Sequence, residues 1–299
     1  MNPHPQYGTP AGEATLAIRK IASRSGGDVQ ELMTLYALEG LLARFALSAH
    51  RGDFVLKGGV LLAAYAARRP TRDIDLLSQG LFQDEVELSK RVHEILQITV
   101  DDGLTFNDRS VSTTAIRDDE ENPGIRIKLT GQLGTAQLRT GLDISFGDPI
   151  WPAPEMIDLP RLVDLGLPPL RLLGYPLTMV LAEKIVTALD RGTANTRWRD
   201  FADIYTLSRH HTVDGNQFRR SLATVALHRH VSLQPLFPLL LSMPGQAQAR
   251  YSTWRTRAHR EAETPERFAQ LLNAVAQFTD PVLQGSSALL WTPEHGEWK

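Results

Sequence analysis

The sequence predicts an α+β protein of two lobes, in which a sheet-and-helix lobe over residues 1–174 precedes a mainly helical lobe over residues 175–299. Apolar or alternating runs that are typical of β-strands occur between residues 54 and 173. After Pro176 the sequence has the periodicity of helices. The chain has 299 residues, of which 42% are hydrophobic and 22% are charged, so it is long and apolar enough for two domains with their own cores.

The expected elements follow in order along the chain. Two helices come first, the second marked by Leu32, Leu35, Leu38 and Leu42. A short apolar strand, a glycine pair and a buried helix follow, and then an amphipathic helix and a mostly antiparallel set of strands. The ranges are 12–24 and 28–50 for the first helices, 54–57 for the first strand, 60–67 and 84–98 for the next helices, 111–116, 125–129, 137–146 and 170–173 for later strands, 118–124 for a turn, and 178–189 for the first helix of the second lobe.

Two carboxylates lie two residues apart in the segment Asp73-Ile74-Asp75-Leu76. Residues two apart in a strand point to the same face, so both carboxylates would project side by side. Adjacent carboxylates repel each other unless a cation lies between them, and Mg²⁺ binds carboxylate oxygens together with substrate phosphates. The strand is therefore a candidate platform for a metal ion and a nucleotide, the alternative being a solvated strand edge.

A glycine pair, Gly58-Gly59, ends the strand before these carboxylates and predicts a phosphate-binding turn. Glycine lets the backbone approach a ligand closely, and the start of the following helix offers free N–H groups to an anion. A glycine pair by itself is usually only a turn, but together with the carboxylates it becomes more specific. We expect Lys57, Thr71 and Arg72 to assist in binding the nucleotide.

A third carboxylate, Asp143, lies on the expected strand 137–146, on the face opposite Leu142 and Ile144. If this strand neighbours the Asp73 strand, Asp143 would join the other two carboxylates around a pair of metal ions. Such a pair would stabilise the attacking and leaving oxygens of an in-line phosphoryl displacement. The alternative is an aspartate that merely faces water.

These motifs resemble those of polymerase-β-type nucleotidyltransferases. Gly58-Gly59, Asp73-Ile74-Asp75 and Leu142-Asp143-Ile144 are similar to the motifs of that superfamily, and residues 69–75 resemble its AbiEii/MenT branch, which comprises bacterial toxins of toxin–antitoxin systems. The later signature of that branch, Ala-Glu-Lys followed by Arg/His-Asp-X-X-Asp, is matched at residues 182–184 and 199–203. The resemblance covers roughly residues 30 to 210 and implies a polymerase-β-like first lobe.

The resemblance also implies a reaction and its partners. A Mg²⁺-dependent toxin of a type IV toxin–antitoxin system would transfer a nucleotide from a nucleoside triphosphate to the 3′ end of tRNA, which would block aminoacylation. Asp73 and Asp75 would be catalytic metal ligands, and Asp143 a metal ligand or base. Lys184 would contact the triphosphate, and Asp200 would be the functional acid of the next helix. A cognate antitoxin is the expected protein partner.

Charge is unevenly distributed along the chain. Residues 176–260 contain 12 Lys and Arg against 5 Asp and Glu, although the net charge of the whole chain is −2. The arginine fork binds phosphate oxygens in bidentate fashion, so this segment predicts an RNA-binding surface, with solvated helix surfaces as the alternative. The candidate RNA-binding residues are Arg197, Arg199, Arg209, Arg219 and Arg220.

Composition limits the chemistry and the compartment. The chain has no cysteine, which excludes disulfides and thiolate catalysis. Its first residues lack the pattern of a signal peptide, and no apolar stretch reaches the ~20 residues needed to span a bilayer, so we expect a cytoplasmic protein without a membrane partner. Two other functions stay open: nucleotidyl transfer to a small-molecule or protein acceptor, which would not need a basic lobe, and binding of RNA or a partner without catalysis.

Overall fold

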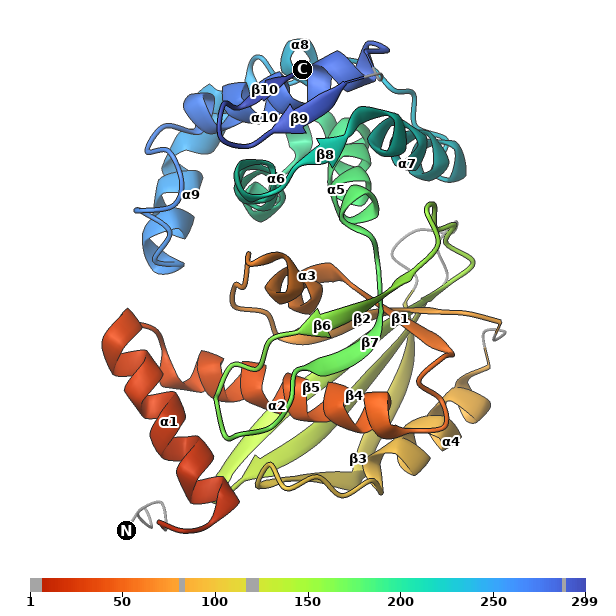
Figure 1. Cartoon of the computed structure of the whole chain (residues 1–299), viewed down its shortest axis with the longest axis vertical. Helices are drawn as coiled ribbons and strands as arrows, with labels where there is room; N and C mark the ends of the chain where they lie inside the picture. Colours follow the sequence, from red (N-terminus) through yellow and green to blue (C-terminus); the bar gives the residue numbers. More distant parts are fainter. Residues whose placement is uncertain (1–6, 81–83, 117–123, 287–288) are drawn as a thin grey trace. The chain divides into compact units, whose positions relative to one another are not determined.

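A computed structural model describes residues 7–80, 84–116, 124–286 and 289–299 (Figure 1). The chain divides into two compact units. Unit 1 contains Met1–Ala64, Arg68–Asp148 and Glu155–Gly174, and unit 2 contains Tyr65–Ala67, Pro149–Pro154 and Tyr175–Lys299. The turn predicted at 118–124 falls, except for its last residue, outside the described residues.

The core of unit 1 is a seven-stranded mixed sheet with the strand order β3-β4-β5-β2-β1-β7-β6. Its strands are β1 (Phe54–Lys57), β2 (Asp73–Ser78), β3 (Leu104–Ile116), β4 (Gly124–Leu133), β5 (Ala136–Phe146), β6 (Glu155–Leu159) and β7 (Leu170–Gly174). β5 runs parallel to β2 and β7 runs parallel to β1, whereas the other neighbouring pairs are antiparallel. The expectation of a mostly antiparallel sheet is confirmed.

Helices precede the strands of this sheet along the chain or lie between them. They are α1 (Pro10–Ser25), α2 (Val29–Leu47), α3 (Gly58–Leu61), the 3₁₀ turn η1 (Leu62–Tyr65) and α4 (Glu85–Leu96). Thr9, Asp28 and Asp84 cap α1, α2 and α4 by accepting hydrogen bonds from backbone N–H groups of the first turn, which would otherwise lack partners. Ile18 of α1 and Tyr36 of α2 share one apolar core with residues of β3, β4 and β5, so both helices pack on the sheet (Figure 1).

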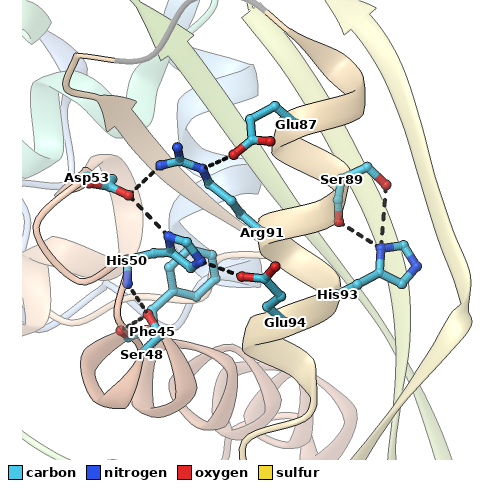
Figure 2. A network of polar contacts seen from close by, with 9 residues as sticks. All are labelled: Phe45, Ser48, His50, Asp53, Glu87, Ser89, Arg91, His93 and Glu94. Atoms are coloured by element: carbon cyan, nitrogen blue, oxygen red, sulfur yellow. Dashed lines mark hydrogen bonds and ion pairs between the residues drawn. The ribbon is translucent and has the colours of Figure 1, made fainter.

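A polar network attaches α4 to the loop that follows α2 (Figure 2). The two ring nitrogens of His50 contact Asp53 at 3.2 Å and Glu94 at 2.8 Å. Arg91 donates to Asp53 and, at 2.8 Å, to Glu87 one turn earlier on the same helix. These contacts fix the loop that leads into β1, the strand that ends at the glycine pair.

Unit 2 is mainly helical. Its helices are α5 (Leu177–Arg191), the 3₁₀ turn η2 (Gly192–Ala194), α6 (Trp198–His210), α7 (Gly215–His228), α8 (Leu236–Leu239), α9 (Met243–Arg257) and α10 (Phe268–Leu283). Phe201 and Phe268 are fully buried and meet edge to face, with ring centroids 5.5 Å apart, which joins α6 to α10. In the part of the chain that the structure describes, no helix is long and apolar enough to cross a bilayer.

Three short strands complete unit 2: β8 (Val213–Asp214), β9 (Leu290–Thr292) and β10 (Glu297–Trp298), in the order β10-β9-β8. Trp291 is 4% exposed, and its indole N–H donates to the Ser208 carbonyl at 2.6 Å. Trp298 stacks on Phe278 with ring centroids 5.6 Å apart. The C-terminal segment is therefore docked on α6 and α10.

The α+β class with a sheet-and-helix lobe before a mainly helical one is confirmed. Three details differ from the expectation. β3 begins at Leu104 rather than at residue 111, and its register with β4 shifts between Asn107 and Ser112, so the first part of the strand lacks a regular alternation in the sequence. The edge strand β6 and the small sheet of unit 2 were not expected, since short strands with charged residues carry little periodic signal.

Candidate active site

Four charged side chains line up across the middle of the unit 1 sheet. Lys57 of β1 is paired with Asp75 of β2, Asp75 with Asp143 of β5, and Asp143 with Arg126 of β4. Paired residues on neighbouring strands share a face, so the row carries charges in the order plus, minus, minus, plus. The adjoining row is buried and apolar, and consists of Leu56, Leu76, Ile144 and Ile125. The sheet thus has a core face and a charged face.

Asp73 lies on the same charged face as Asp75, two residues away on β2. Its strand neighbour is Gly141 of β5. A Cβ at Gly141 would lie 2.5 Å from Asp73 Oδ1, so glycine is needed for the carboxylate to lie where it does. The sequence does not predict this role of Gly141, because nothing in its local pattern indicates which side chain lies against its backbone.

The glycine turn closes directly on Asp75. Gly58 has φ +65°, and a Cβ there would lie 1.9 Å from Asp75 Oδ2, so both its conformation and its space require glycine. The Gly59 N–H points to the same carboxylate oxygen at 3.4 Å. The buried helix predicted at 60–67 is instead a single α-helical turn from Gly58 followed by η1. A full helix dipole is therefore absent, and the backbone N–H groups of one short turn are what this segment offers a phosphate.

Asp143 lies beside Asp75, since β2 and β5 are neighbours. Arg126 holds it in a bidentate ion pair, in which Nε and Nη2 donate to Oδ1 and Oδ2, each at 2.7 Å. Burial raises the pKa of Asp73, and the nearby negative charge of Asp143 raises it further, while Arg126, Arg72 and Lys128 lower it. The carboxylates therefore repel each other, and the surrounding cations partly offset that repulsion.

The donor chemistry of Asp73 and Asp75 fits a hard divalent cation, which needs only one or two protein carboxylates when substrate phosphates complete its shell. Both oxygens of Asp143 already accept hydrogen bonds from Arg126. No cluster of three or more histidine, aspartate or glutamate side chains is arranged as a metal site among the described residues. A metal-binding role of Asp143 would thus require a rearrangement at Arg126.

The other predicted nucleotide-binding residues flank this face. Lys57 donates to Asp148 at 2.7 Å, and Ser145 donates to the same carboxylate oxygen at 2.7 Å. Thr71 does not belong to β2, which begins at Asp73. Its hydroxyl instead faces Gly59, where a Cβ would lie 2.8 Å from Thr71 Oγ1. Arg72 is exposed next to Asp73.

In unit 2, Lys184 of α5 lies between two carboxylates of α6. Its Nζ donates to Asp200 at 3.0 Å and to Asp203 at 2.7 Å, and its side chain is only 11% exposed. Arg197 donates to the second oxygen of Asp200 at 2.6 Å. Burial acts to raise the pKa of Asp200, but Lys184 and Arg197 outweigh it and lower this pKa to about 2. Asp203 thus also contacts Lys184.

A family model for the nucleotidyl transferase AbiEii toxin of type IV toxin–antitoxin systems matches residues 40–291. The chain belongs to the AbiEii family. The resemblance stated from the sequence is confirmed, and the coarse function follows: this is a nucleotidyltransferase-family toxin of a toxin–antitoxin system.

The solved structures that are similar to this AbiEii-family chain include those of JHP933 and MenT4. JHP933 from Helicobacter pylori has 16% sequence identity and a TM-score of 0.53, over 86% of this chain and 95% of that chain. MenT4, a nucleotidyltransferase toxin from Mycobacterium tuberculosis H37Rv, has 16% identity and a TM-score of 0.51, over 87% and 98% of the respective chains. At this identity the likeness shows the fold. A search of curated proteins found no match.

The candidate RNA-binding arginines of this AbiEii-family protein lie on α6 and α7 or next to them. Arg197, Arg199, Arg209 and Arg220 are exposed. Arg209 lies over the ring of Tyr205 at 5.7 Å, and Arg220 over that of Trp151 at 5.3 Å. Arg219 is less exposed and donates to the Val282 carbonyl at 2.8 Å, so it also has a structural contact with the end of α10. Their RNA-binding role stays a prediction.

Proposed function

We propose that this AbiEii-family protein is a Mg²⁺-dependent nucleotidyltransferase that transfers a nucleotide from a nucleoside triphosphate to the 3′ end of tRNA. The observation that carries the proposal is the position of Asp73 and Asp75, on one strand face with the Gly58-Gly59 turn closed against Asp75. Carboxylates bind a cation and an adjacent glycine turn accommodates phosphate groups, so the two together suit a metal-bound triphosphate.

Four residues at this face have a proposed task. Asp73 and Asp75 would hold Mg²⁺, which when bound neutralises charge on the triphosphate. The backbone at Gly58 and Gly59 would orient the triphosphate so that the acceptor hydroxyl attacks the α-phosphorus in line, with pyrophosphate as the leaving group. Catalysis would come from positioning and electrostatics rather than from a covalent enzyme intermediate. Lys184 stays a predicted triphosphate contact.

The acceptor is proposed from the family and from charge. The exposed arginines of unit 2 would bind the phosphate backbone of tRNA, and such binding weakens steeply with added salt. Addition of nucleotides at the 3′ end would block aminoacylation and so translation. A cognate antitoxin protein would control this activity in the cell, as membership of a toxin–antitoxin family implies.

The test is label transfer. The purified chain is incubated with Mg²⁺, total bacterial RNA and each α-labelled nucleoside triphosphate in turn. We expect label on tRNA-sized RNA from the native chain, and at least about a hundredfold less from Asp73→Ala, because a loss of about 2.7 kcal/mol in transition-state stabilisation has that effect. Asp158→Ala is the matched control, since this aspartate is 67% exposed on the edge strand β6 of the same sheet.

Either of two results would contradict the proposal. Equal labelling by the native chain and Asp73→Ala would remove the carboxylate pair from the mechanism. No labelled RNA with any triphosphate would reject tRNA as the acceptor, and label on an added small molecule or protein would identify the alternative class.

A further inference from the structure

The charged face of the unit 1 sheet contains an arginine that the reaction outlined above does not use. Arg126 ends the row of four charges on β4, and its pairing partner across the strands is Asp143. The side chain is 42% exposed, whereas that of Asp143 is 21% exposed. Arg126 is therefore the more exposed member of the pair, while Asp143 lies between Asp75 and Arg126 across the strands.

The ion pair has the strongest geometry available to these two groups. Nε and Nη2 of Arg126 each lie 2.7 Å from a different oxygen of Asp143, which is the bidentate arrangement of a guanidinium and a carboxylate. An exposed ion pair with poor geometry would contribute little, but a bidentate pair is an exception to that rule. The positive charge of Arg126 thus offsets the negative charge of Asp143 when the pair is formed.

A cation at Asp143 would have to compete with the guanidinium. The two positive groups would share the same pair of oxygens, and in a partly buried site their repulsion is several-fold stronger than in water. The two carboxylates of β2 have backbone neighbours as well: the Gly59 N–H faces Asp75, and the backbone of Gly141 lies against Asp73.

We propose that Arg126 is a positioning residue that occupies Asp143 in the resting protein and is displaced when a divalent cation binds. The cation would first bind Asp73 and Asp75, and Asp143 would become available only after the guanidinium has turned away. Arg126 thereby weakens binding of free cations. This inference rests on the proposed function, because it assumes that the carboxylate face binds a divalent cation.

The experiment measures Mn²⁺ binding by electron paramagnetic resonance, with the full chain and without nucleotide. We expect Arg126→Met to bind Mn²⁺ about tenfold more tightly than the native chain, a change that corresponds to about 1.4 kcal/mol. Lys128→Met is the matched control, because Lys128 lies two residues further along β4 on the same face and is paired with Gly141 rather than with a carboxylate. We expect it to change the affinity less than threefold.

A double-mutant cycle separates an effect through Asp143 from a general effect of charge. If Arg126 acts through Asp143, Arg126→Met changes Mn²⁺ affinity in the native background but not in the Asp143→Asn background. An equal gain in both backgrounds, or no gain in either, would overturn the inference. Arg126→Gln repeats the cycle with a polar side chain if the methionine variant does not fold, as judged by circular dichroism.

The inference and the proposed function fail in different ways. Absence of labelled RNA from the native chain contradicts the function, and the Mn²⁺ cycle is still measurable. Labelled RNA from the native chain together with unchanged Mn²⁺ affinity of Arg126→Met contradicts the inference alone.

Discussion

At the scale of single residues, space at the backbone decides where the two β2 carboxylates lie. Asp75 contacts the position that a Cβ of Gly58 would occupy, and Asp73 contacts the corresponding position of Gly141. Both glycines therefore determine where the carboxylates lie, although neither contributes a side chain. The space at Gly141 yields a prediction, because its backbone conformation, unlike that of Gly58, is one that alanine can adopt.

We predict that Gly141→Ala lowers nucleotidyl transfer at least tenfold but leaves the melting temperature nearly unchanged. The added methyl group would displace the Asp73 carboxylate, whose tip is 2.5 Å away, while alanine in a strand interior has a smaller entropy cost than glycine. Label transfer and thermal unfolding measure the two effects. Gly52→Ala is the control, since no atom lies within 4 Å of a Cβ there. Full activity of Gly141→Ala would show that Asp73 does not need its present position.

The sequence predicts the site residues that lie close together along one segment. It does not predict the residues that pairing between strands brings to the site. Asp73, Asp75 and the glycine pair are recognisable because their spacing along one segment carries the information. Arg126 and Gly141 matter through the register between β4, β5 and β2, which depends on tertiary pairing. The alternation Ile125-Arg126-Ile127-Lys128 does indicate a charged face on β4, but it does not indicate the partner.

At the scale of elements, ion pairs join α5 to α6, a contact that the sequence does not predict. Lys184 of α5 is held by Asp200 and Asp203, which are one turn apart on α6. The helical periodicity of both segments is evident in the sequence, and the spacing of the aspartates indicates a shared face. The periodicity does not indicate that Lys184 is nearly buried between the two carboxylates.

This arrangement predicts a pH dependence. The pKa of Asp200 is lowered to about 2, so the folded state binds the proton less tightly than the unfolded state. Its stabilising contribution is fully present above about pH 4 and is lost as the pH falls through about 2, and it amounts to about 2 kcal/mol at 1.36 kcal/mol per unit. We expect urea unfolding between pH 5 and pH 2.5 to show a steeper loss of unfolding free energy for the native chain than for Asp200→Asn.

Asp190→Asn serves as the comparison for that experiment, because Asp190 is exposed on α5. This variant should keep the steep loss seen in the native chain. Parallel curves for the native chain and Asp200→Asn would mean that the ion pairs of Asp200 do not stabilise the fold.

At the scale of the whole molecule, the chain forms two units, and each is completed by segments distant in sequence. The sheet of unit 1 incorporates β7 next to β1, and the small sheet of unit 2 pairs β8 with β9. The sequence predicts a change from strands to helices close to Gly174, but it does not predict the short segments 65–67 and 149–154 that belong to unit 2. Those segments contribute through contacts such as the hydrogen bond from Ser221 to the Trp151 carbonyl at 2.8 Å.

We predict that Trp291→Ala destabilises unit 2 selectively, by about 3–5 kcal/mol as expected for a buried tryptophan. The side chain packs against Phe278 and Trp298, with ring centroids 4.9 and 5.4 Å away. Hydrogen exchange should show lost protection in α6 and α10 and unchanged protection in β2 and β5. Trp254→Ala is the control, because this tryptophan is only partly buried on α9. Equal losses in the two units would contradict the prediction.

The docking of Trp291 and Trp298 also bears on how the protein is made. A nascent chain has all the strands of unit 1 once Gly174 has left the ribosome, whereas unit 2 must wait for β10, which ends at Trp298. At about 5–20 residues per second, the interval is roughly 6 to 25 s. The strands of the carboxylate face are therefore all synthesised before the helical unit is complete, so a chain stalled in that interval would display the proposed cation site without a completed second unit.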